Sequence, residues 1–144
     1  IDNLNKIYQK SFAINKIINI ELGKDVISSY KRTSNILEAE TKSEEVELLE
    51  TADPGIFKSE YEKNLYKKIK ELRKYFLNIK RDNDEDYDQT LINLASLKKP
   101  VFEFFDNIIV NDKDLTIRKN RLELLQMLCK TFENYINFSK IESA

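Results

Sequence analysis

Four lysines on one predicted helix form the most regular set of charges in the chain. Lys63, Lys67, Lys70 and Lys74 are spaced i, i+4, i+7 and i+11, which places four ammonium groups in one row on a helix surface. Such a row can bind the phosphates of a nucleic-acid backbone. A solvated helix face in a lysine-rich chain explains the same spacing without a ligand and is the simpler interpretation. Binding of an RNA backbone is the alternative.

Lys31, Arg32 and Asn35 form a second group of polar residues that could contact RNA. We expect them on the exposed side of a helix, because the inward-facing residues around them share the opposite face. A guanidinium beside an amide can bind phosphate or the edges of unstacked bases. The alternatives are pairing with the acidic segment that follows and docking onto another part of a larger protein. The residues expected on the inward face are Val26, Tyr30, Thr33 and Leu37.

Arg118, Asn120 and Arg121 lie within the apolar repeat of the last predicted helix. An arginine in such a place needs an acceptor as it loses its water. Asp106, which follows two phenylalanines on the preceding helix, is the expected partner of Arg118 or Arg121. We favour this structural ion pair over contact of the three residues with RNA.

The chain contains few of the groups that enzymes use for catalysis. It has no histidine, which excludes histidine-based acid–base chemistry and histidine metal ligands. Neither glycine lies in a phosphate-binding loop, and the single cysteine, Cys129, falls on an apolar helix line where we expect an inert core thiol. The acidic run 82–88 lacks the regular spacing of a calcium loop. We therefore predict no catalytic residue and no metal site in this chain.

Apolar residues recur at intervals of three and four throughout, which predicts an all-α bundle of five to six helices without a sheet. Ser59 and Glu62 form a capping box, Pro100 is expected to open a new helix, and Asn111 or Asp112 is expected to cap the last helix. Gly23 is expected to separate the first two helices. The predicted helices cover residues 4–18, 25–37 or slightly further, 59–80, 87–97, 100–109 and 112–136.

Length and charge fit one helical domain over residues 1–144. The net charge of −1 hides separate blocks, because residues 58–81 carry nine Lys or Arg against three Glu. Such segregation can present a basic face to a polyanion. The chain begins without methionine and shows no apolar run of signal or membrane-spanning length. We therefore expect a cytoplasmic fragment of a longer protein, with no membrane contact.

Several separated motifs resemble the C-terminal end of the bacterial glycyl-tRNA synthetase β subunit, and the likeness spans roughly 13–141. The resemblance implies a helical anticodon-binding module of the DALR type. Tyr30 and Arg32 are also similar to a Tyr-x-Arg pattern in the anticodon-domain helix of arginyl-tRNA synthetase. Residues 1–15 and 38–53 depart from the pattern, and the second of these is acidic enough to repel RNA. The matching motifs are 31–37, 53–57, Leu65 with Tyr66, 94–101, 104–106 and 118–125.

This resemblance implies a domain that positions tRNA(Gly) for charging by the α subunit of a glycine–tRNA ligase. The domain itself would hold no cofactor, since ATP and Mg²⁺ would be used by the α subunit. Its expected partners are tRNA(Gly) and that subunit. The rival interpretation is a helical protein-interaction module that docks onto other domains or the α subunit with little RNA contact.

Overall fold

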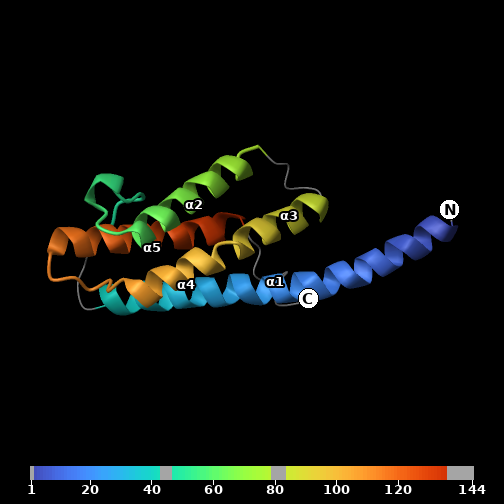
Figure 1. Cartoon of the computed structure of the whole chain (residues 1–144), viewed down its shortest axis with the longest axis horizontal. Helices are drawn as coiled ribbons and strands as arrows, with labels where there is room; N and C mark the ends of the chain where they lie inside the picture. The colour runs from blue at the N-terminus through green and yellow to red at the C-terminus, as the bar shows by residue number, and fades with distance from the viewer. Residues whose placement is uncertain (1, 43–46, 79–83, 136–144) are drawn as a thin grey trace.

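A computed structural model describes residues 2–42, 47–78 and 84–135, with side chains from residue 20 onward in the first helix and from residue 88 onward in the third. These residues form a helical bundle with no strand among them, so the all-α prediction is confirmed (Figure 1). Helices α3, α4 and α5 lie between α1 and α2. The elements are α1 (Asp2–Thr41), η1 (Pro54–Ile56), α2 (Glu60–Phe76), α3 (Asp84–Ala95), α4 (Lys98–Asn107) and α5 (Leu115–Tyr135).

The first helix is continuous, and the predicted break at Gly23 is wrong. A glycine inside a helix costs only about 1 kcal/mol relative to alanine, which packing can offset. Gly23 is buried together with the small residues Ser29 and Thr33, and α1 packs against α3, α4 and α5. The two buried hydroxyls donate to carbonyls one turn back, at 2.8 Å each, so their burial leaves no donor unsatisfied. A stripe of small residues therefore allows α1 to lie against its neighbours.

The second helix follows its sequence signals closely. The Ser59 hydroxyl accepts the Glu62 N–H at 3.3 Å and donates to the Glu62 carboxylate at 3.2 Å, which confirms the predicted capping box. The same carboxylate accepts the backbone N–H of Lys58 at 3.2 Å. The predicted apolar stripe faces the core, although α2 ends at Phe76 and residues 79–80 lie outside the described part. Its buried members are Leu65, Ile69, Leu72 and Phe76.

Three other helices have boundaries that differ from prediction. The last helix is capped by Asp114, whose carboxylate accepts the N–H groups of Thr116 and Ile117 at 2.9 and 3.3 Å. The predicted cap Asp112 instead accepts the N–H of Asp114 and pairs with an arginine. Helix α3 begins at Asp84, three residues before the predicted start at residue 87. Helix α4 begins at Lys98, so the prediction that Pro100 opens it is wrong by two residues. Pro100 still lies in the first turn, where its missing N–H needs no partner.

Helix α5 is the centre of the core and is buried on most of its circumference. It packs against α1 on one side and α2 on the other, which explains why its apolar residues do not form a narrow stripe. Cys129 is buried among them; this burial, with a smaller effect of Glu133, raises the pKa of its thiol to about 12. The buried position of Cys129 confirms the predicted core thiol, and the raised pKa of this thiol disfavours the reactive thiolate. The largest buried side chains of α5 are Leu122, Leu124, Leu125, Met127, Leu128 and Phe132.

Candidate nucleic-acid interface

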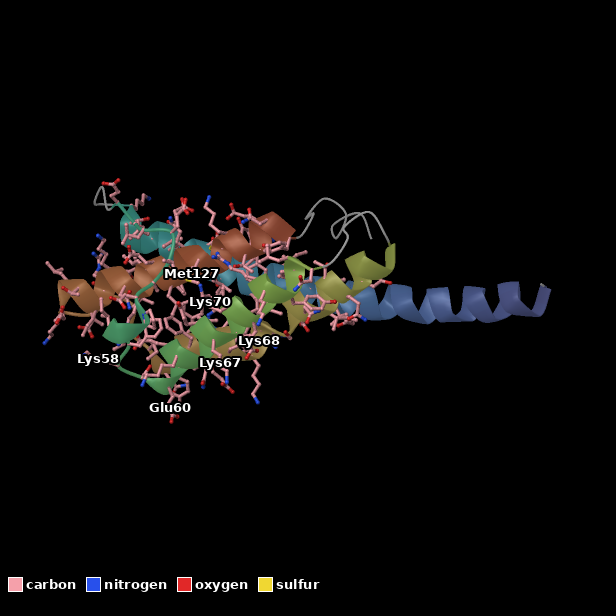
Figure 2. All side chains as sticks on the ribbon, turned by 90° about the horizontal axis from the view of Figure 1, so that it is seen from above. Lys58, Glu60, Lys67, Lys68, Lys70 and Met127 are labelled. Carbon is pink, nitrogen blue, oxygen red and sulfur yellow. The ribbon has the colours of Figure 1, made fainter. Side chains whose placement is uncertain are left out.

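The four lysines of α2 lie on the outer face of the bundle. Lys63, Lys67, Lys70 and Lys74 are all exposed, opposite the buried stripe of the same helix. Figure 2 shows Lys67, Lys68 and Lys70 along α2, the helix nearest the viewer in that view. The Lys70 ammonium lies 5.8 Å from the centre of the Tyr66 ring. We call these four residues the lysine row; its role in RNA binding stays a prediction.

An arginine that sequence reasoning missed fixes the C-terminal half of α2. Arg73 donates from Nε to the Thr131 hydroxyl at 3.0 Å and from Nη2 to the Met127 carbonyl at 2.9 Å. Both acceptors belong to α5. The available signal was its spacing, since Arg73 stands four residues after Ile69 and three before Phe76, beside the buried stripe. The lysine row is therefore carried by a helix whose inner side is firmly attached.

A buried ion pair fixes the other end of α2. Glu62 is 0% exposed, and its Oε1 accepts from Nη2 of Arg121 at 3.3 Å. Arg121 Nη1 donates to the Ile109 carbonyl at 2.7 Å and to Asp112 Oδ2 at 3.3 Å. The predicted partner Asp106 is wrong for Arg121, because α5 turns this guanidinium toward α2 and the α4–α5 connection. One arginine thus joins α5 to two other segments.

Arg118 and Asn120 also make structural contacts. Arg118 donates to the Glu40 carbonyl at 2.8 Å, with the Glu40 carboxylate at 3.9 Å, and so links α5 to the end of α1 rather than to Asp106. Asn120 is 1% exposed; it accepts the Asp53 N–H at 2.7 Å and donates to the Asp53 carbonyl at 3.0 Å. These two hydrogen bonds engage both the oxygen and the NH₂ group of the amide. The amide is therefore not available to RNA, as the alternative prediction for this residue required.

Arg32 lies against α4 instead of projecting into solvent. Its guanidinium carbon is 4.8 Å from the Phe102 ring centre and 5.1 Å from that of Phe105, and Nη2 is 3.6 Å from Asp106. The side chain is 35% exposed. The expectation of a free surface arginine is therefore wrong, because α4 presents two aromatic faces and a carboxylate to it. Lys31 and Asn35 are exposed as expected.

Tyr30 belongs to the α1–α5 contact. Its hydroxyl donates to the Glu133 carboxylate at 3.3 Å, and its ring meets Phe132 edge to face with centres 6.0 Å apart. Burial, and next the charge of Glu133, raise the pKa of the tyrosine above its usual value of 10.0. Among described residues there is no group of three or more potential metal ligands, and no described helix could span a membrane.

The sequence-family model of the DALR anticodon binding domain matches residues 26–143, which is most of the chain. The chain belongs to this family. The match includes α2 with the lysine row and the whole of α5, so the DALR domain covers the elements that form the bundle's core.

Curated relatives of this DALR domain carry the name glycine–tRNA ligase beta subunit. The protein of Rickettsia bellii (strain OSU 85-389) is 36% identical over 139 residues, which cover 96% of this chain and 19% of the relative. Those of Rickettsia prowazekii (strain Madrid E) and Rickettsia africae (strain ESF-5) are 35% and 32% identical, covering 84% and 90% of the chain and 17% and 18% of the relatives. The chain thus spans about a fifth of their length. No solved structure matches it significantly.

Proposed function

We propose that this DALR domain binds tRNA as part of a glycine–tRNA ligase β subunit, with the lysine row contacting phosphates. The names of the relatives and of the family support the substrate class. The observation that supports α2 as the site of tRNA contact is the lysine row itself, which is exposed along its whole length. At about 1.5 Å rise per residue it extends roughly 16 Å, enough to follow several phosphates of one strand.

The charge balance of α2 supports a polyanion as its partner. Its outer residues include the lysine row and the half-buried Lys68, against two exposed acids, Glu60 and Glu71. Glu62 is turned inward and is neutralised by Arg121, so it does not reduce the outward positive charge. Attraction of a phosphate backbone by such a face is independent of base sequence. Discrimination between bases would therefore come from other contacts.

In this proposal the domain positions the tRNA. A helix held by Arg73 at one end and by the Glu62–Arg121 pair at the other gives the ammonium groups a fixed frame, so bound tRNA takes one orientation. Glycine activation, with its ATP and Mg²⁺, belongs in this proposal to the α subunit as partner of the β subunit. The enzyme acts in the cytoplasm.

Affinity for tRNA measured against ionic strength tests this function. The double variant Lys67→Gln/Lys70→Gln should bind more weakly and should lower the magnitude of the salt slope by about 1.4–1.8, since each phosphate contact contributes about 0.7–0.9. The matched control is Lys113→Gln/Lys130→Gln, which removes two exposed lysines outside α2. Equal slopes for the two double variants would contradict the assignment to α2, and a wild-type affinity independent of salt would contradict RNA-backbone binding.

A further inference from the structure

A hollow of mixed lining lies where α5 begins, between that helix end and segment 49–56. Its volume is about 470 Å³, and the apolar side chains of Leu49, Ile56 and Leu115 line it together with polar neighbours. Leu49 is 62% exposed and Leu115 is 74% exposed. A single exposed leucine is ordinary, whereas two large exposed leucines in one hollow favour an interaction surface. We call this surface the end hollow.

The backbone that presents the end hollow is held by buried polar side chains. Glu123, only 5% exposed, accepts the Leu49 N–H at 2.6 Å. Asn120 fastens Asp53 through its two bonds. Segment 49–53 is therefore fixed to α5 through its backbone, and this leaves the Leu49 side chain on the surface. A binding surface ordered in advance loses less entropy when a partner docks.

The charge around the end hollow disfavours RNA. Asp53 lines the hollow and is exposed. The exposed Glu50 stands in the sequence between two lining residues, Leu49 and Thr51, and no basic residue occurs between residues 47 and 57. The lining contains one lysine, Lys119. Acidic groups repel phosphates and attract basic side chains. The end hollow and the lysine row thus favour opposite kinds of partner.

We propose that the end hollow binds a protein surface in which an apolar side chain is flanked by Lys or Arg, supplied by another part of the same β subunit. The inference rests on the proposed function, because it needs the longer subunit of which this chain would be a part. In the relatives, about four fifths of the polypeptide lies outside the matched region. The apolar side chain fills the hollow, and its basic neighbours face the exposed carboxylates of Asp53 and Glu50.

Photo-cross-linking in the full-length subunit tests this interface. The photoreactive residue p-benzoyl-phenylalanine replaces Leu115 in one protein and, as matched control, Ile109 in another; Ile109 is 75% exposed but does not line the end hollow. Irradiation without tRNA should join position 115 to a segment of the same polypeptide that carries Lys or Arg beside an apolar residue. Position 109 should give no such product. Thermal unfolding of both proteins checks that the fold is kept.

A charge reversal supplies the second arm. Glu50→Lys should reduce the cross-link from position 115 several-fold, whereas Lys67→Gln/Lys70→Gln should leave it unchanged. A cross-link to tRNA when tRNA is added, a cross-link to a second copy, or no cross-link above the control would overturn the proposal. Because the cross-link is measured without tRNA, its presence in a protein that fails to bind tRNA would refute only the proposed function.

Discussion

Removing the Arg121 guanidinium should destabilise the domain strongly. Arg121→Met keeps an unbranched side chain of similar length but deletes the donors to Glu62, Ile109 and Asp112, which lie at 2.7–3.3 Å. Glu62 would keep its bonds from Ser59 Oγ and the Lys58 N–H. It would nevertheless lose its only buried counter-charge among the described residues while remaining 0% exposed.

The expected loss in free energy of unfolding is about 3–5 kcal/mol, the cost of leaving one member of a buried pair without its partner. For a chain of this size each kcal/mol lowers the melting temperature by about 2–4 °C, so the shift should be roughly 6–20 °C. Urea unfolding with an unchanged m-value measures the free energy directly. Lys130→Met, at an exposed position of α5, is the control and should cost little.

A double-mutant cycle separates the pair from general damage. Glu62→Gln removes the buried charge while keeping an oxygen for the helix cap, so Arg121→Met should cost clearly less in that background than in the wild type. A loss below about 1 kcal/mol for Arg121→Met alone, the range of an exposed pair, would refute the buried-charge reasoning. Strict additivity in the cycle would refute the coupling between the two residues.

Asp106→Ala should change the free energy of unfolding by less than about 1 kcal/mol, because its side chain is 67% exposed and its contact with Arg32 is a surface pair; a larger loss in urea unfolding would restore a structural role. Asn120→Leu should cost about 1–3 kcal/mol by the same assay, since the Asp53 backbone loses two partners, and an unchanged midpoint would contradict this. Cys129, with its pKa raised from 9.0 to about 12, should resist alkylation near pH 8 until the chain unfolds. The stability that the protonated Cys129 thiol contributes to folding is fully present below pH 9 and is lost as the pH rises toward 12. In that window only the folded state keeps the proton. Rapid alkylation of the folded protein would show an accessible thiolate.

Local sequence signals predicted α2 well because its determinants are close in sequence. Ser59 and Glu62 are three residues apart, and the stripe of α2 repeats within one helix. Gly23 misled the prediction of α1 for a related reason: a local helix breaker was weighed without the packing that offsets it. Likewise, two aspartates, Asp112 and Asp114, precede α5; Asp112 pairs with Arg121, and Asp114 caps the helix.

Partners of buried charges could not be predicted from the sequence. Arg121 stands 59 residues from Glu62, so nothing local distinguished Glu62 from the nearer Asp106. Glu62 has two roles, because it forms the capping box with Ser59 and also neutralises an arginine of another helix. The lysine row was placed correctly because exposure needs only the helix period, whereas Arg32 needed knowledge of which faces of α4 it meets.

Acetylation of individual lysines with and without tRNA, followed by mass spectrometry, tests the central claim without altering the protein. If α2 contacts the tRNA backbone, saturating tRNA should slow acetylation of all four residues of the lysine row several-fold at low salt. Lys113 and Lys130, exposed outside α2, should react at unchanged rates, and added salt should remove the protection. Unchanged reactivity of the row while tRNA is bound would contradict the account and place the RNA on another face of the bundle.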